Sequence, residues 1–119
     1  MLFHVFNSQE ERRAYGGSAF IEIQFCKLPD EKIVNKRVAL RSLHHWQNDS
    51  LYIDDETLFY NEYHLIFDDL DIFSMNYYGP ETIKPIIERI IITKPMEYEF
   101  LVDWLIKAKE FNGFYILGL

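Results

Sequence analysis

The spacing of hydrophobic positions predicts one strong helix near the C-terminus. Over residues 95–111, large apolar side chains recur every three or four positions and share one face: Phe100, Leu101, Trp104, Leu105 and Ala108. Acidic residues precede this face and lysines follow it, which is the charge order that the helix macrodipole favours. Asn112-Gly113 then supplies a typical helix end.

Strands are predicted where apolar and polar residues alternate, or where short apolar runs stand between polar breaks. Residues 18–26 alternate Ile21, Ile23 and Phe25 with Glu22 and Gln24, which is the pattern of a half-buried strand. The same reasoning predicts further strands at residues 2–6, 51–53, 57–60, 63–67, 72–77, 90–93 and 114–117.

Start signals predict further helical segments. Pro29-Asp30 can open a helix that runs to about Trp46, with an extended segment over 38–43 as the alternative. Gly79-Pro80 marks a turn and a helix start, and residues 7–14 form a polar or helical turn with Ser8 and Glu11 at capping-box spacing. Residues 57–70 fit a helix as well as strands, and the β-propensity of Tyr, Phe and Ile favours strands there.

These elements indicate an α+β fold, with a mostly antiparallel sheet packed against two or three helices. The chain has 119 residues, of which 49% are hydrophobic and 17% aromatic. That apolar content can fill a core for a chain of this size, and it excludes intrinsic disorder, which needs low hydrophobicity. No repeat or linker divides residues 1–119, so we expect a single globular domain.

The negative charge is concentrated in the middle of the chain. The net charge is -7, yet the flanking residues 1–41 and 84–119 contain all twelve Lys and Arg. Residues 42–83 contain no Lys or Arg and nine acids: Asp49, Asp54, Asp55, Glu56, Glu62, Asp68, Asp69, Asp71 and Glu81. A deficit of basic residues disfavours nucleic-acid binding through a basic face.

Motifs for catalysis, metals or nucleotides are missing from the sequence. His44 and His45 are adjacent, so on a helix their side chains diverge and cannot both reach one metal without a turn to redirect them. A metal site would also need Asp49, Asp54 or His64 to converge on them. Residues 68–71 lack the glycine and the final Glu of a calcium loop, and the glycines form no phosphate loop. Cys26 is expected to be a core thiol. The sequence therefore predicts no enzyme, no metal and no cofactor.

Compartment signals favour the cytoplasm. A single cysteine cannot form an internal disulfide, and the first residues lack the basic region of a secretory signal. The longest aliphatic stretches are far shorter than the roughly 20 residues that cross a bilayer. We expect a cytoplasmic protein with no membrane partner.

The acidic middle block is the candidate site, because carboxylates without local basic neighbours are interleaved with aromatic rings. Such a face attracts a basic protein surface, and its rings can serve as desolvated anchors. The predicted partner-binding residues are Asp54, Asp55, Glu56, Tyr60, Asp68, Asp69, Asp71, Tyr77 and Tyr78. The alternative is a solvated acidic face over core aromatics.

In size, acidity and α+β pattern, with its acidic aromatic block from Trp46 to Asp71, the chain resembles the immunity proteins of bacterial contact-dependent growth inhibition and related polymorphic toxin systems. The resemblance is to the class and rests on no motif matched residue by residue. It implies a cytoplasmic inhibitor that binds a cognate toxin domain, often a basic nuclease. The alternatives are a phage-type nucleic-acid mimic that inhibits a host nuclease, and a small enzyme or ligand-binding domain.

Overall fold

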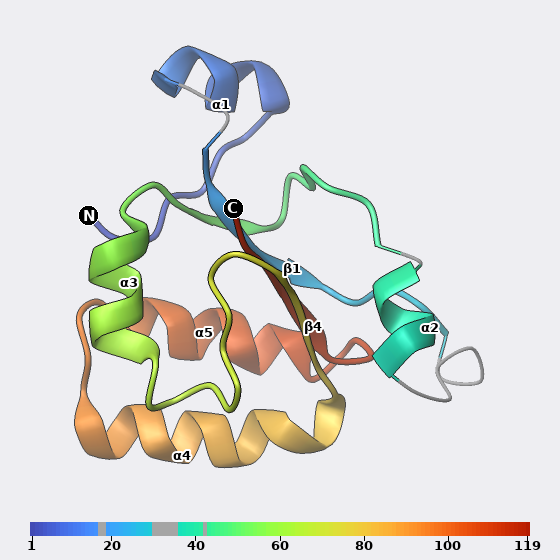
Figure 1. The fold of residues 1–119 in the computed structure, drawn as a ribbon, viewed down its shortest axis with the longest axis vertical. Helices are drawn as coiled ribbons and strands as arrows, with labels where there is room; N and C mark the ends of the chain where they lie inside the picture. Colours follow the sequence, from blue (N-terminus) through green and yellow to red (C-terminus); the bar gives the residue numbers. More distant parts are fainter. Residues whose placement is uncertain (17–18, 30–35, 42) are drawn as a thin grey trace.

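A four-stranded antiparallel sheet is the centre of the part of the chain that the computed structural model describes, residues 1–16, 19–29, 36–41 and 43–119. The strand order is β2-β1-β4-β3, so the C-terminal strand lies inside the sheet (Figure 1). In chain order the elements are α1 (Gln9–Gly16), β1 (Ile21–Phe25), α2 (Lys36–Arg41), β2 (Leu51–Ile53), α3 (Glu56–Tyr63), β3 (Met75–Tyr78), the 3₁₀ turn η2 (Pro80–Thr82), α4 (Ile83–Thr93), α5 (Tyr98–Ala108) and β4 (Phe114–Leu117). The predicted α+β class is confirmed.

The main core lies between one face of the sheet and helices α3, α4 and α5 (Figure 1). Antiparallel pairing aligns Ile23 with Ile116 and Phe25 with Phe114, so these side chains share that face. Buried residues of the three helices, among them Phe59, pack against them. This layer is the predicted packing of the sheet on helices.

The opposite face of the sheet is covered by α2 and by residues 43–50. Cys26, Tyr115 and Leu117 form a smaller cluster there with Ala39 of α2. The Cys26 sulfur lies 3.2 Å from the Tyr115 hydroxyl, which also donates to the Ala39 carbonyl at 2.7 Å. Cys26 is therefore a core thiol, as predicted.

The C-terminal elements match the sequence prediction most closely. Helix α5 lies inside the predicted range 95–111, and its buried residues are Leu101, Trp104, Leu105 and Ala108. Phe100, which was predicted for the same face, is instead exposed. Gly113 has a φ of +86° at the turn into β4, where a Cβ would collide with the Tyr78 carbonyl. Glycine is therefore required at this position. Strands β2 and β4 have the predicted bounds.

The predicted strands at residues 57–60 and 63–67 are wrong, because the chain forms helix α3 followed by turns. The side chain of Asp55 accepts a hydrogen bond from the Leu58 backbone N–H at 3.0 Å and so caps α3. Phe59, Tyr63 and Phe67 then face the core at helical spacing. The cap and this buried row outweigh the β-propensity of the aromatic residues.

Four other predicted elements differ. Residues 2–6 make a single bridge, between His4 and Tyr52, because the Glu97 carboxylate accepts the N–H groups of residues 2 and 3. Residues 90–93 are the last turn of α4, and the strand predicted at 72–77 is Met75–Tyr78. Helix α2 covers only residues 36–41 of the helix predicted from Pro29 to Trp46. Residues 43–46 are not helical, and positions 30–35 and 42 lie outside the described residues.

Strand β1 is buried on both faces, so the predicted half-buried strand is wrong as well. Glu22 and Gln24 lie on the face that α2 and residues 43–50 cover, and both are almost inaccessible. In the N-terminal turn, Ser8 accepts the Glu11 N–H at 3.1 Å and the Glu11 carboxylate accepts the Asn7 N–H at 2.8 Å, which agrees with the predicted cap of α1. Across the described ranges, no helix has both the length and the apolar character needed to cross a bilayer.

Two tyrosine hydroxyls withdrawn from water predict a loss of stability at alkaline pH. Burial raises the pKa of Tyr52 and of Tyr77 to about 12, against an ordinary value of 10.0. Both groups bind their protons more tightly in the folded protein, so their contribution is complete below pH 10 and is lost as pH rises toward 12. We expect the free energy of unfolding, measured by urea denaturation, to fall across this interval. A constant value would show that these hydroxyls ionise equally easily when folded.

Candidate functional site

The first group of predicted site residues lies at the start of α3. Asp55 is the N-cap of this helix and Glu56 is in its first turn, where carboxylates meet the positive end of the helix dipole. Asp54 precedes them and accepts a hydrogen bond from the Tyr15 hydroxyl at 3.1 Å, and its other oxygen lies 3.3 Å from His4 Nε2. That bond to the carboxylate is the main reason why the pKa of Tyr15 is raised. Asp54 and Asp55 thus have structural partners besides any partner protein.

The second group occupies the loop between α3 and β3. The buried amide of Asn76 organises this loop, because it donates to the carbonyls of Asp71 and Ile116 at 2.9 Å each and accepts the Asp71 N–H at 3.0 Å. Asp71 also accepts the N–H of Phe73 at 2.9 Å. The loop is therefore held in one shape from inside the protein.

The predicted acidic residues differ in whether their carboxylates have a partner within the protein. Asp68 pairs with Arg89 of α4 at 3.4 Å, although it has no basic neighbour along the chain. Asp69 is exposed and has a φ of +55°, a backbone conformation that Asp and Asn tolerate better than most residues. Among the described residues, the side chains of Asp69 and Glu56 have no hydrogen-bond or ion-pair partner. These two carboxylates are the ones available for steering.

Tyr60 joins the two groups. It lies on α3 one turn after Glu56, is 40% exposed, and stacks on His64 with ring centroids 4.8 Å apart. It lines an open hollow of about 400 Å³ together with residues of the loop: Leu70, Asp71, Ile72 and Phe73. We call Glu56, Tyr60, Asp69 and these four loop residues the acidic α3 surface.

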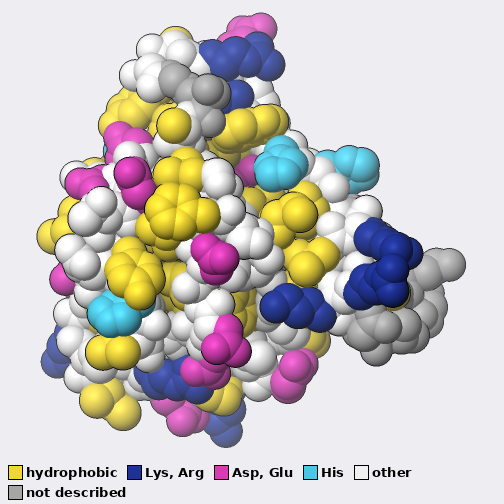
Figure 2. All heavy atoms as spheres, in the orientation of Figure 1, with side chains coloured by type: hydrophobic (Ala, Val, Ile, Leu, Met, Phe, Trp, Pro, Cys, Tyr) yellow, Lys and Arg dark blue, Asp and Glu magenta, His cyan; other side chains and the backbone are white. Residues whose placement is uncertain are grey.

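Phe73 is the feature of this surface that the sequence prediction missed. Its side chain is 70% exposed, and nearby in the chain Leu65 is 82% exposed. Figure 2 shows hydrophobic side chains gathered over α3 and the following loop, with acidic side chains beside them. The helical alternative for residues 57–70 indicates the exposure of Tyr60 only, because a core-facing row at 59, 63 and 67 leaves Tyr60 on the outer side of the helix.

Tyr77 and Tyr78 do not belong to the acidic α3 surface. Successive residues of β3 point to opposite faces of the sheet. Tyr78 is buried in the main core, where it stacks on Phe114 and donates to the Asp68 carbonyl at 3.0 Å. Tyr77 is half-buried on the other face and donates to the Asn112 carbonyl at 2.7 Å. Their contacts make them structural residues.

The described residues offer little for a metal. No group of three His, Cys, Asp or Glu side chains among them converges closely enough to hold an ion. His44 and His45 are both exposed and lie on the segment between α2 and β2.

Comparison with models of known protein families, with characterised proteins and with solved structures finds no match for this chain.

Proposed function

We propose that this protein is an immunity protein that binds a basic toxin domain through the acidic α3 surface and thereby neutralises it. The observation that carries the proposal is that the exposed rings around this hollow belong to the same surface as Glu56 and Asp69, whose carboxylates have no partner among the described residues. Phe73 and Tyr60 line the hollow together with Asp71, in a stretch of 42 residues without Lys or Arg. The resemblance to the immunity class suggests that the partner is a toxin domain.

The physical roles of the two kinds of side chain differ. Exposed carboxylates act at long range and raise the association rate with a positively charged face. A large exposed ring gains free energy only when a partner removes it from water, so it controls the dissociation rate. The loop that carries Phe73 is already held by Asn76, so binding would not have to order it.

A growth-protection assay tests the proposal directly. The toxin domain encoded next to this chain's gene would be produced in cells that lack the chain, with and without the chain supplied in trans. We expect growth to be restored only when the chain is present, and the two purified proteins to form a complex. Continued growth arrest together with the absence of a complex would contradict the proposal.

Two variants connect the assay to the acidic α3 surface. Phe73→Ser should weaken the complex by at least roughly tenfold, mainly through faster dissociation, as expected for an aromatic anchor. Asp69→Asn keeps a residue that tolerates the positive φ and should slow association and reduce its salt dependence. Surface plasmon resonance at two salt concentrations separates the two effects.

Ile92→Ser is the matched control for Phe73→Ser, since Ile92 is 80% exposed on α4, outside the acidic α3 surface. It should leave both rates unchanged. Equal effects of the two variants would remove Phe73 from the interface. Asp55→Lys is a poor test of charge because it also removes the cap of α3.

A further inference from the structure

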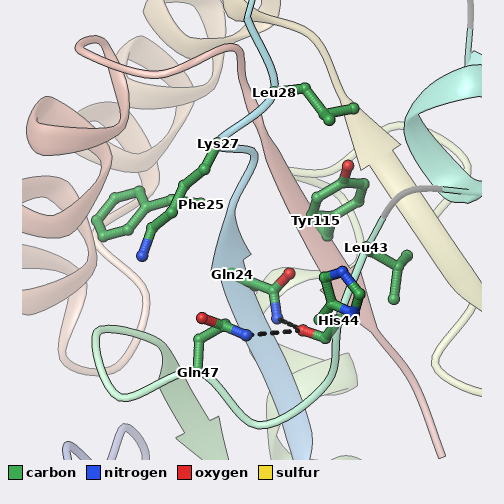
Figure 3. A pocket seen from close by; sticks show the side chains of 8 residues that line it. All are labelled: Gln24, Phe25, Lys27, Leu28, Leu43, His44, Gln47 and Tyr115. Carbon is green, nitrogen blue, oxygen red and sulfur yellow. Dashed lines mark hydrogen bonds between the residues drawn. The ribbon is translucent and has the colours of Figure 1, made fainter.

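A second hollow lies on the sheet face opposite the main core, between β1 and the segment that precedes β2 (Figure 3). Its volume is about 260 Å³, smaller than pockets for drug-sized ligands. It is distinct from the acidic α3 surface and shares no residue with it. Apolar and polar groups both line it, including Gln24, Lys27, Leu28, Leu43, His44 and Tyr115.

Gln24 gives this hollow an unused hydrogen-bond acceptor. The residue is only 3% exposed, and its Nε2 donates to the Glu22 carboxylate at 2.9 Å and to the His44 carbonyl. Two acceptors on one side of the amide fix its orientation. The oxygen Oε1 therefore faces the other way, into the hollow (Figure 3), and has no partner among the described residues.

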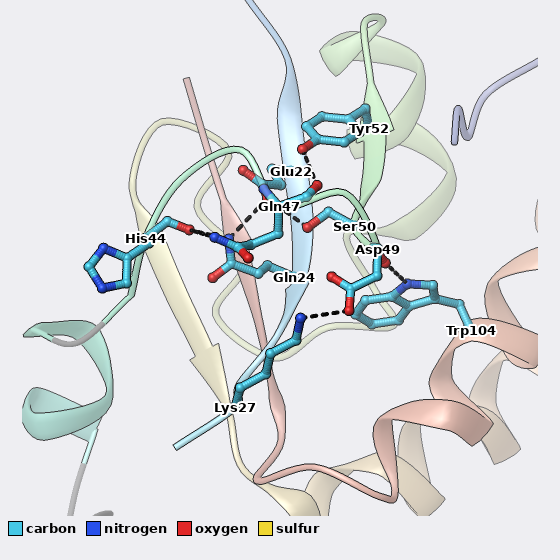
Figure 4. Close-up of polar contacts among 9 residues, drawn as sticks. All are labelled: Glu22, Gln24, Lys27, His44, Gln47, Asp49, Ser50, Tyr52 and Trp104. Carbon is cyan, nitrogen blue, oxygen red and sulfur yellow. Dashed lines mark hydrogen bonds and ion pairs between the residues drawn. The ribbon is translucent and has the colours of Figure 1, made fainter. Parts of the chain in front are cut away.

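The wall of the hollow is preorganised by Glu22. Its buried carboxylate accepts the backbone N–H of Trp46 at 2.7 Å. It also accepts the backbone N–H of Gln47 at 2.9 Å and the Ser50 hydroxyl at 2.6 Å (Figure 4). Trp46 has a φ of +67°, so this anchor holds a bend that the backbone would not favour by itself. A rigid wall lowers the entropy cost of binding a ligand.

Lys27 supplies a positive charge and hydrogen-bond donors to the hollow. Its amine lies 2.7 Å from Asp49 and its side chain is 47% exposed. An ammonium has three hydrogens, so it can keep Asp49 and still donate to an anion. The hollow thus combines an acceptor, a cation and an apolar wall from Leu28, Leu43 and Tyr115.

We propose that this hollow binds a small carboxylic acid with a hydrogen-bond donor beside the carboxylate, the shared chemistry of amino acids and hydroxy acids. The donor satisfies Gln24 Oε1, the carboxylate meets the Lys27 amine, and an aliphatic tail lies against the apolar wall. Among the described residues no buried side-chain nitrogen or oxygen lacks a partner, so Oε1 is open to solvent from the hollow. A ligand donor held there by the lysine and the apolar wall can therefore replace the water that this acceptor would otherwise bind.

A set of four matched probes tests the proposal by NMR on the ¹⁵N-labelled protein. L-leucine and its 2-hydroxy analogue have both groups, 4-methylpentanoate lacks the donor, and L-leucinamide lacks the carboxylate. We expect a saturable shift of the Gln24 side-chain amide with L-leucine or the hydroxy acid. The two incomplete probes should bind at least roughly tenfold more weakly. The stronger of the complete probes identifies the class of ligand.

Variants assign the binding to the hollow. Lys27→Met should weaken the complete probe by roughly tenfold, whereas Lys84→Met on α4 should not change it. Leu43→Trp should abolish binding by filling the space. The proposal is overturned if none of the four probes gives a saturable shift, if all four bind equally, or if Lys27→Met binds as the wild type does.

Discussion

Replacing Trp104 by alanine should lower the free energy of unfolding by about 3 to 5 kcal/mol, the usual cost of removing a buried Trp. Trp104 is 7% exposed and stacks on Phe25 of β1 with ring centroids 4.0 Å apart. It meets Phe114 of β4 edge to face at 6.1 Å, and its Nε1 donates to the Asp49 carbonyl at 3.1 Å. The alanine would leave a cavity between helix and sheet and an acceptor without its donor.

Two companion variants separate these contributions in urea denaturation. Trp104→Phe keeps a ring against Phe25 and loses the hydrogen bond, which is worth about 1 kcal/mol. Phe100→Ala lies on the same helix but at a position that is 40% exposed, so it should cost less than Trp104→Ala. If Trp104→Ala lowers the free energy of unfolding no more than Phe100→Ala does, helix α5 does not pack on the sheet through Trp104.

Periodicity alone was sufficient for α5, β2 and β4. The apolar face of α5 is regular over three turns. The apolar runs of β2 and β4 are too short for a buried helix, so a strand is the element that they predict. For residues 57–70, periodicity alone did not decide between helix and strand. Helical and alternating patterns coexist there, and the cap by Asp55 together with the buried row at 59, 63 and 67 favours the helix.

Glu22 and Gln24 show why the sequence pattern of β1 does not predict that its polar side chains are buried. Alternation of polar and apolar residues normally means that one face of a strand meets water. Here that face is covered, and the partners of the Glu22 carboxylate include backbone N–H groups about 25 positions away. No local pattern announces such partners, because every residue has a backbone N–H.

The candidate surface was predictable in charge but not in its anchors. The absence of Lys and Arg over residues 42–83 is visible in the sequence, and the free carboxylates of Glu56 and Asp69 lie in that block. Whether an aromatic ring reaches the surface depends on the secondary structure of the segment that carries it. Tyr78 packs in the core because β3 directs it there, whereas Phe73 is exposed in the loop.

The second large effect is expected for Glu22→Gln, which should lower the free energy of unfolding by about 2 to 4 kcal/mol. The Glu22 carboxylate is 1% exposed and accepts hydrogen bonds from Gln24, Trp46, Gln47 and Ser50. Glutamine has one oxygen and a donor NH₂, so its nitrogen would face N–H or O–H donors wherever it is placed. At least one of the donors to this carboxylate would lose its acceptor.

Ser50→Ala is the control for this substitution, because it removes one donor and leaves the carboxylate with three others. It should cost only about 1 kcal/mol. The two variants should also differ at Trp46, which is tied to Glu22 through its backbone and stacks on Tyr52 with ring centroids 6.1 Å apart. In a Trp104→Phe background, Glu22→Gln should shift the fluorescence of Trp46 toward that of a solvated indole, and Ser50→Ala should not. Equal stability of Glu22→Gln and the wild type would mean that residues 46–50 keep their shape without the carboxylate, and that the rigid wall beside Gln24 has another origin.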